Sequence, residues 1–154
     1  DQYPNLIILQ TLSKAWGMAG LRLGLAFARE DIAATLGRVK YPYNINVVTQ
    51  RIVLEQLAKE IGGEVTEIVK QRERVVCELK NCPVVKNIYP SDANFILIKV
   101  DDPGRIYHQL INEGVIVRDR SRIRGCEGCL RITIGTPEEN DKLLRLMSGI
   151  AANS

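Results

Sequence analysis

A lysine in a glycine-containing segment is the part of this sequence with the clearest capacity for chemistry. Residues 11–24 read TLSKAWGMAGLRLG. Lys14 follows a short apolar run, and the end of a buried strand would hold its amine still and partly desolvated, which disfavours the ammonium form. A neutral amine can attack an aldehyde and form a Schiff base. Thr11, Ser13 and Arg22 offer hydrogen-bond donors for a phosphate. Pyridoxal phosphate carries both an aldehyde, which the amine can attack, and a phosphate, which these donors can bind, so the segment suits this cofactor.

A plainer interpretation of the same segment stays open on these residues alone. The stretch can be a strand, a polar loop and a second strand, with Lys14 merely solvated. Gly17 and Gly20 allow a tight turn or the close approach of backbone to a ligand, but scattered glycines are a weak signal. A Walker-type phosphate loop is excluded, because the sequence contains no Gly-Lys-Ser or Gly-Lys-Thr.

The elements that must position this segment indicate an α/β chain. Continuous apolar runs at 5–10 and 23–28 predict strands buried on both faces of a parallel sheet. From about residue 42 onward the predicted order is long helices, β, β, α, β, β, α, which suits an open α+β layer with helices on one side of a sheet. Helices are predicted at 30–37, 46–60, 63–80, 103–113 and from 136 onward, and strands at 84–88, 94–100, 115–118 and 130–134.

Several predicted helix ends have local signals. Asn44 or Asn46 can cap the helix after the break around Pro42. The pair Gly62-Gly63 predicts a break between the two long helices. Further signals are Asp102 with Pro103, Gly114 as a helix end, and Thr136, Pro137 and Glu139 as cap, first and third positions of the last helix.

Composition and charge exclude several classes of function. The 154 residues are 45% hydrophobic and 25% charged, which suits one domain or one domain plus a piece of a second. The formal charge of +3 is too small to predict a nucleic-acid partner. The basic stretch 118–124 is better explained as a polar loop, because few aromatic side chains are available to stack bases. No apolar run approaches the length of a membrane span.

Cysteine and histidine usage predicts no metal site. Without a signal peptide, Cys77, Cys82, Cys126 and Cys129 are expected to be reduced thiols of a cytosolic protein. The spacings C-x4-C and C-x2-C leave zinc as an alternative that needs all the thiols to converge. His108 has no second histidine nearby, so a surface or packing role is expected.

The lysine segment closely resembles that of the fold-type I, pyridoxal-phosphate-dependent aminotransferases. It is most similar to the histidinol-phosphate branch, whose pattern reads much like T-x-S-K-A-x-G-L-A-G-L-R-x-G. Further segments resemble that branch in the same order, so the resemblance covers essentially all of the chain: PYNIN at 42–46, SDANFIL at 91–97, VIVRD at 115–119 and GCLRITIGT at 128–136.

The resemblance implies a role for each of these residues. Lys14 would bind pyridoxal phosphate covalently and shuttle the proton between the substrate's α-carbon and the cofactor's C4′. Thr11, Ser13 and Arg22 would hold the cofactor phosphate. The implied substrate-binding residues are Arg131, which would take the anionic group, Arg118 as a second arginine, and Asn94, with Tyr43 also close to the active site.

The resemblance also implies the organisation of the whole enzyme. Residues 1–41 would be the C-terminal piece of the large, cofactor-binding domain, and residues 42–154 a small C-terminal α+β domain. The enzyme would be a cytoplasmic homodimer that acts on a phosphate-bearing amine, histidinol phosphate, and on glutamate or 2-oxoglutarate. An aspartate, an aromatic ring, an asparagine and a tyrosine that the family uses for the cofactor precede the lysine segment, so the chain alone is expected to be inactive.

Two alternatives stay open at this point. One is a related enzyme that acts on a phosphate-bearing substrate, such as a threonine-phosphate decarboxylase. The other is a non-catalytic module with an aminotransferase-like fold, although a pure scaffold would have no need of Lys14, Arg22 and Arg131.

Overall fold

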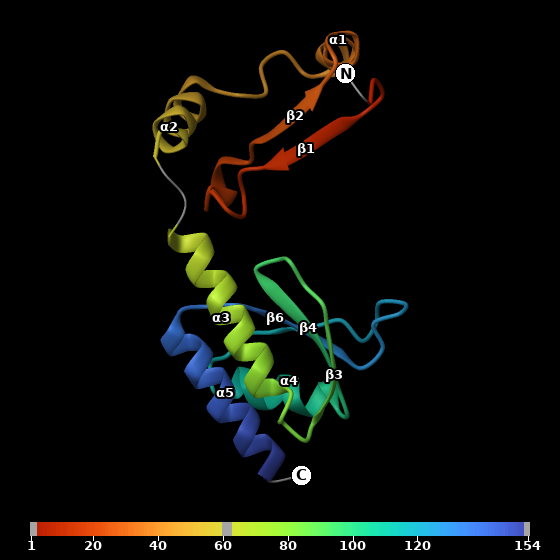
Figure 1. The fold of residues 1–154 in the computed structure, drawn as a ribbon, viewed down its shortest axis with the longest axis vertical. Helices are drawn as coiled ribbons and strands as arrows, with labels where there is room; N and C mark the ends of the chain where they lie inside the picture. Colours follow the sequence, from red (N-terminus) through yellow and green to blue (C-terminus); the bar gives the residue numbers. More distant parts are fainter. Residues whose placement is uncertain (1–2, 60–62, 153–154) are drawn as a thin grey trace. The chain divides into compact units, whose positions relative to one another are not determined.

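The computed structural model describes residues 3–59 and 63–152. Its chain divides into two compact units, Asp1–Gly62 and Gly63–Ser154 (Figure 1). The predicted domain boundary between residues 41 and 42 falls inside the first unit and stays a prediction about the whole enzyme.

The first unit is built on an antiparallel ribbon followed by two helices. Strand β1 (Ile7–Thr11) pairs with β2 (Gly24–Ala28), and Thr11 lies opposite Gly24. The expectation that these strands run parallel is therefore wrong. The connection between them, residues 12–23, contains one 3-10 turn, η1 (Ala19–Leu21), and no α-helix of the kind that usually forms the crossover between parallel strands. Helices α1 (Glu30–Val39) and α2 (Val47–Leu57) follow.

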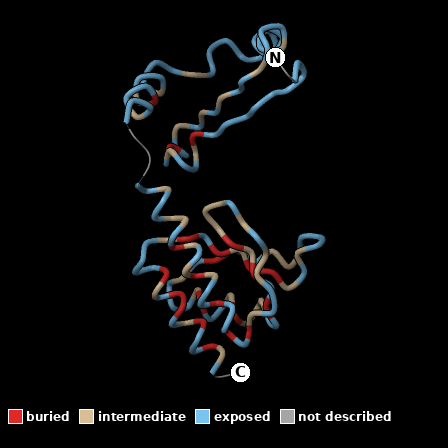
Figure 2. The backbone as a smooth tube through the Cα atoms, viewed as in Figure 1, coloured by how far each residue is buried: buried red, intermediate tan, exposed pale blue. Residues whose placement is uncertain are grey.

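Most apolar side chains of this ribbon are exposed, which corrects the expectation of two buried strands, although Leu25 is half-buried against the cluster around Leu12. Leu9 is 79% exposed and Phe27 52% exposed, and the tube in Figure 2 is mostly pale blue along β1. A continuous apolar run suits a strand covered on both faces. In the described part of the first unit, neither face of the ribbon carries such a cover.

The helices of the first unit follow their predicted signals closely. The side chain of Asn46 accepts a hydrogen bond from the backbone of Thr49 at 2.8 Å, which confirms it as the cap of α2. Helix α2 ends at Leu57, before the predicted end at residue 60. Residue 60 and Gly62, the first glycine of the predicted break, lie outside the described residues.

The second unit is an α+β layer in the predicted order. A four-stranded antiparallel sheet has the strand order β3-β4-β6-β5. The predicted strand at 115–118 overlaps β5 only at Arg118, because only Arg118 and Asp119 pair with β6 at the edge of the sheet. The elements are α3 (Gly63–Leu79), β3 (Val85–Tyr89), β4 (Phe95–Val100), α4 (Pro103–Asn112), β5 (Arg118–Asp119), β6 (Cys129–Thr133) and α5 (Pro137–Ala152).

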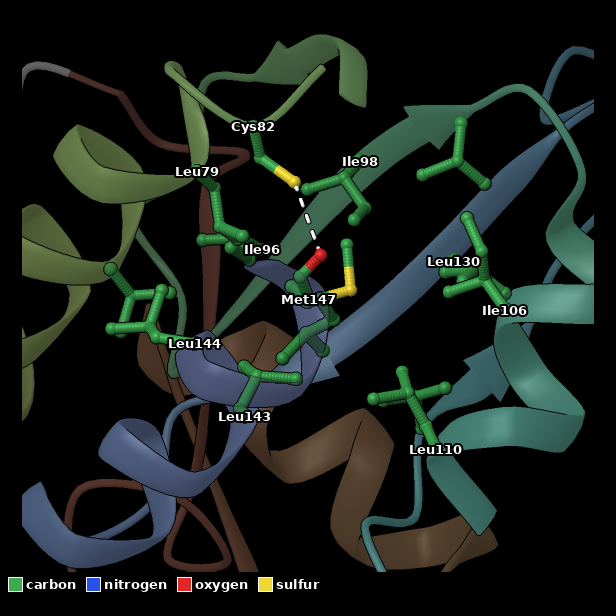
Figure 3. Close-up of a cluster of buried hydrophobic side chains, with 14 of the residues drawn as sticks. Leu79, Cys82, Ile96, Ile98, Ile106, Leu110, Leu130, Leu143, Leu144 and Met147 are labelled. Carbon is green, nitrogen blue, oxygen red and sulfur yellow. Dashed lines mark hydrogen bonds between the residues drawn. The ribbon is translucent and has the colours of Figure 1, made fainter. Parts of the chain in front are cut away.

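One face of this sheet and the three helices share a single core. Ile96 and Ile98 of β4 and Leu130 and Ile132 of β6 are fully or almost fully buried. Because alternate residues of a strand point to one face, these side chains define the covered side. The helices therefore lie on one side of the sheet, as predicted (Figure 3), and contribute Val75, Leu79, Ile106, Leu110, Leu143, Leu144 and Met147 to the core.

The start of α5 satisfies its free backbone groups with a reciprocal pair of hydrogen bonds. The backbone of Thr136 donates to the Glu139 carboxylate at 2.8 Å, and the backbone of Glu139 donates to the Thr136 hydroxyl at 3.3 Å. This is the predicted capping box. Asp102 likewise caps α4 through the backbone of Arg105 at 2.9 Å, and Gly114, at a φ of 75°, follows its end.

A buried polar network ties α3 to α5. The Asn140 side chain accepts from the Gly135 backbone at 3.0 Å and donates to the Gly135 carbonyl at 3.0 Å and to the Gln71 side chain at 3.2 Å. The Gln71 oxygen also accepts from Arg74, whose guanidinium reaches Asp141 at 2.7 Å. Because buried polar groups need their partners, this network fixes how the two helices pack.

Replacement of Asn140 by aspartate tests the importance of the network. We expect N140D to lower the chain's free energy of unfolding by about 3 kcal/mol, because it removes two donated hydrogen bonds and buries a charge. Urea denaturation followed by circular dichroism measures the change. The matched control is N87D at an exposed position of β3, where a change within about 0.5 kcal/mol is expected. Equal effects of the two substitutions would contradict the assignment.

Candidate functional site

The loop that carries Lys14 has a defined conformation, because buried side chains and backbone hydrogen bonds hold it. Leu12 is 0% exposed and packs with Met18 and with Val53 of α2. The backbone of Met18 donates to the Leu12 carbonyl at 2.9 Å, and the backbone of Gly17 donates to the Lys14 carbonyl at 2.9 Å. Lys14 therefore begins a tight turn directly after β1.

The predicted phosphate-binding residues leave the ribbon at the same end as Lys14. Thr11 is the last residue of β1 and pairs with Gly24, the first residue of β2. Ser13 and Arg22 lie two residues beyond this pair, one on each side of the loop. The structure thus brings Thr11, Ser13, Lys14 and Arg22 to one short segment, as the sequence predicts.

The hydroxyls and the amine of this segment can meet a ligand. The Thr11 hydroxyl oxygen accepts from the backbone of Ser13 at 3.1 Å, so its own hydrogen stays available to donate. Lys14 is exposed, and within the described residues its amine has no hydrogen-bond or ion-pair partner. The partial desolvation expected for Lys14 is therefore absent in this chain, because the exposed ribbon supplies no cover for the strand end.

Arg22 has an unusual backbone. Its φ of 53° and ψ of 39° lie in the left-handed region. Among the described residues, Arg22 is the one non-glycine residue whose φ is positive. This conformation costs an ordinary residue about 1–2 kcal/mol. One guanidinium nitrogen donates to the Ala19 carbonyl at 3.2 Å, which leaves other donors of the planar fork for an anion. An outlier of this kind is often found where a ligand is held.

Arg131 and Arg118 lie side by side on the second unit. They are directly opposite each other in the β5–β6 ladder. Arg131 projects from the sheet face away from Leu130 and Ile132, as the strand alternation predicts. The centre of its guanidinium lies 5.0 Å from the centroid of the Phe95 ring, a distance at which cation and ring attract.

This pair of arginines lacks anionic partners. None of the ion pairs formed by the described residues includes Arg118 or Arg131, and the buried Nε of Arg131 has no hydrogen-bond partner. Like charges directly opposite each other in a sheet repel, and a buried donor without an acceptor is costly. A carboxylate or phosphate bound between the two guanidinium groups would offset their repulsion. The neighbouring Asp119 accepts instead from the Ser121 backbone at 2.8 Å, which lowers the pKa of this carboxyl.

Asn94 is held at the start of β4, next to the ring on which Arg131 stacks. Its carbonyl accepts from the backbone of Ile134 at 2.9 Å. The preceding turn is fixed by the Ser91 hydroxyl, which donates to the Phe95 carbonyl at 2.6 Å, and by Arg72, which donates to the Ala93 carbonyl at 2.8 Å. The half-buried Asn94 thus lies directly before Phe95 in the chain and opposite Ile134, the residue that follows β6.

The predicted site residues therefore form two groups, one on each unit. The lysine group comprises Thr11, Ser13, Lys14 and Arg22, and Tyr43, 95% exposed, belongs to the same unit. The arginine group comprises Arg118, Arg131 and Asn94. The supporting roles of Phe95 and Leu12 were not predicted. The signal for Phe95 was a large aromatic side chain next to Asn94, and the signal for Leu12 was an apolar residue beside Ser13.

The cysteines and the histidine form no cluster with these groups. All four cysteines are free thiols, with Cys82 and Cys129 buried. Over residues 3–59 and 63–152, no three His, Cys, Asp or Glu side chains gather as metal ligands would. His108 is exposed, and its ring meets that of Tyr107 edge-on at 5.5 Å. None of the described helices combines the length and apolarity that a membrane crossing requires.

Comparisons with known proteins show likeness along nearly the whole chain. Residues 1–146 match the family described as aminotransferase class I and II. A histidinol-phosphate aminotransferase from Parabacteroides distasonis is 50% identical over 150 residues, which cover 96% of this chain and 44% of that protein. The chain thus spans less than half the length of this curated relative.

Solved structures agree with the sequence comparison. The crystal structure of histidinol-phosphate aminotransferase from Clostridium acetobutylicum matches 99% of this chain and 48% of its own, with a TM-score of 0.90 and 26% identity. The Sinorhizobium meliloti histidinol-phosphate aminotransferase, in complex with pyridoxal-5'-phosphate, matches 97% of this chain and 42% of its own. Its TM-score of 0.83 at 20% identity shows a shared fold.

Anion binding by the arginine pair is testable on this chain. We expect inorganic phosphate to raise the midpoint of thermal unfolding, because a ligand that binds only the folded state stabilises it. R131Q should lose most of this gain, whereas R145Q, at an exposed position of α5, should keep it. Circular dichroism is the suitable measurement, since the chain's one tryptophan, Trp16, lies on the first unit. An equal gain in R131Q and the unsubstituted chain would contradict the assignment.

Proposed function

This chain belongs to the class I and II aminotransferases, and from this membership we propose that it is part of a histidinol-phosphate aminotransferase. The whole enzyme would interconvert histidinol phosphate and imidazole-acetol phosphate, with glutamate and 2-oxoglutarate as the second pair, in histidine biosynthesis. The single observation that carries the proposal is the loop after β1, where Lys14 has an unpaired amine beside two hydroxyls and the left-handed Arg22. The relatives named above support the choice of substrate.

The residues of the loop fit pyridoxal phosphate. The Thr11 hydroxyl, the Ser13 hydroxyl and the free donors of Arg22 would hold the phosphate, which accepts charge-assisted hydrogen bonds. When bound, the cofactor supplies an aldehyde and an electron-accepting ring. The Lys14 amine would hold the cofactor's aldehyde carbon and, once displaced by the substrate, move the proton between the substrate's α-carbon and C4′.

The arginine pair fits the two substrates that must share one site. Histidinol phosphate ends in a phosphate, and glutamate ends in a carboxylate. A planar guanidinium binds either group with two parallel hydrogen bonds. Arg131, held over the Phe95 ring with an unsatisfied Nε, is the residue we assign to the anionic end, with Arg118 opposite it and Asn94 at the edge.

The proposal extends to the setting of the whole enzyme. We assign it to the cytoplasm, which suits four free thiols, and to a homodimer, which the family resemblance implies. The chain spans 44% of its Parabacteroides relative, and the exposed apolar ribbon supplies no cover for the cofactor loop. These two observations support the prediction that the chain by itself does not turn over substrate.

Trapping of the cofactor on Lys14 tests the proposal directly. We expect borohydride reduction of the whole enzyme with pyridoxal phosphate to place the adduct on Lys14, as read by peptide mass mapping, and not on the exposed Lys40. K14R should lower the rate of transamination by roughly 10³-fold or more. Scattered labelling of many lysines would overturn the assignment of Lys14. Release of carbon dioxide from threonine phosphate, without transamination of histidinol phosphate, would favour the decarboxylase alternative.

Replacement of Arg22 separates cofactor binding from backbone strain. R22G in the whole enzyme should raise the dissociation constant for pyridoxal phosphate about tenfold or more, because a charge-assisted contact is lost. The unfolding free energy of the cofactor-free enzyme should stay equal or rise by up to about 1 kcal/mol, since glycine adopts the left-handed conformation freely. R22N, which also tolerates this conformation, is the matched variant. Unchanged cofactor affinity in both variants would remove Arg22 from the site.

A further inference from the structure

We propose that Cys126 and Cys129 form a reversible disulfide across the last turn of the loop between β5 and β6. The C-x2-C spacing stands out in the sequence, and neither the cofactor loop nor the arginine pair uses it. The inference concerns a redox modification of this chain and does not depend on which substrate the enzyme takes.

The loop holds the two cysteines at the ends of one tight turn. Three successive backbone hydrogen bonds, each 2.9 Å long, run from Ile123 to the Arg120 carbonyl, from Cys126 to the Ile123 carbonyl and from Cys129 to the Cys126 carbonyl. Residues joined in this way across four positions have Cα atoms within about 7 Å of each other. Disulfide-bonded cysteines have Cα atoms about 4.4–6.8 Å apart, so the turn already provides a suitable spacing.

The turn is fixed rather than transient. Gly128, at a φ of 77°, occupies its third position, where a type II turn needs a residue that tolerates positive φ. The Gly128 carbonyl accepts from Val100 of β4 at 2.9 Å, and the Cys129 carbonyl accepts from Arg120 at 2.9 Å. The two thiols are therefore kept close to each other by the same sheet that carries the arginine pair.

The two thiols differ in how easily an oxidant reaches them. Cys126 is half-buried, whereas Cys129 is 1% exposed. Burial raises the pKa of the Cys129 thiol, and the neighbouring Cys126 thiol acts in the same direction, which agrees with their proximity. Cys126 is accordingly the thiol that meets a reagent first, and Cys129 is the one that resolves the product.

The reaction is a thiol–disulfide exchange with a small-molecule disulfide such as oxidised glutathione. The Cys126 thiolate attacks one sulfur of the reagent, whose S–S bond breaks and releases one thiolate. Cys129 loses its proton to water and attacks the Cys126 sulfur of the mixed disulfide, which releases the second thiolate. One disulfide is reduced and one is formed, so the electrons balance. Disulfides of this kind in cytosolic proteins are usually transient.

A metal ion is a weaker explanation of the same pair. Structural zinc takes four ligands, and across the described residues no third cysteine, histidine or carboxylate joins Cys126 and Cys129 in a metal-binding group. A bridge needs these two sulfurs alone. It would restrict the turn 126–129 that leads into β6, the strand that carries Arg131.

Peptide mapping of the folded chain tests the inference without any substitution. Trypsin cleaves after Arg124 and Arg131, so one peptide, 125–131, contains both thiols, and peptide 75–80 contains the exposed Cys77 as a reference. After treatment with oxidised glutathione and alkylation, we expect peptide 125–131 to have lost two hydrogen atoms and to carry neither reagent. Cys77 should carry a single glutathione. The ratio of the bridged form to the mixed disulfide on peptide 125–131 should be at least about tenfold higher in the folded chain than in urea. The folded turn raises the effective concentration of one thiol at the other.

Each other outcome counts against the inference. A persistent mixed disulfide on Cys126, no reaction of either thiol in the folded chain, or an equal yield of bridge in urea would overturn it. G128A provides a second measurement, because alanine is strained at this positive φ and its Cβ would meet the Val100 carbonyl at 3.4 Å. Circular dichroism confirms that the variant is folded. A folded G128A should form the bridge several-fold less readily, and an undiminished yield would contradict the role of the turn.

Discussion

The pairing of β4 with β6 is the constraint on which the second unit depends. In this register Ile96 lies opposite Ile132 and Ile98 opposite Leu130, so one face of the two strands becomes the floor of the core. The same alternation forces Arg131 onto the other face, away from the described helices of the second unit. The burial of apolar side chains on one face of the sheet thus determines that Arg131 lies on the opposite face.

The first unit depends on a smaller anchor. Leu12 is buried against Met18 and Val53, and this packing shapes a loop on which Thr11, Lys14 and Arg22 are exposed and Ser13 is half-buried. The strands on either side of the loop are apolar yet exposed, and a two-stranded ribbon by itself has little stability in water. The lysine loop is therefore shaped locally, whereas the environment that would tune its amine is not part of the described residues.

Each of the two units holds a guanidinium that has no anionic partner among the described residues. Arg22 is kept on its loop by a left-handed backbone, and Arg131 is kept on its strand by the Phe95 ring. The Arg22 guanidinium uses one donor for the Ala19 carbonyl and the Arg131 Nε has no acceptor, and a bound anion would accept hydrogen bonds from either guanidinium. The proposed enzyme needs one anion site for its cofactor and one for its substrates.

The sequence alone determined the lysine segment, the order of the elements and most helix ends, because these depend on neighbours within a few residues. Asn46, Asp102 and the Thr136–Glu139 box are examples of such local signals. Only the tertiary structure decided that β1 and β2 run antiparallel and that Arg118 faces Arg131. Strand direction and register are set by pairing between distant segments and by the burial of one sheet face, and neither can be read from the local order of residues.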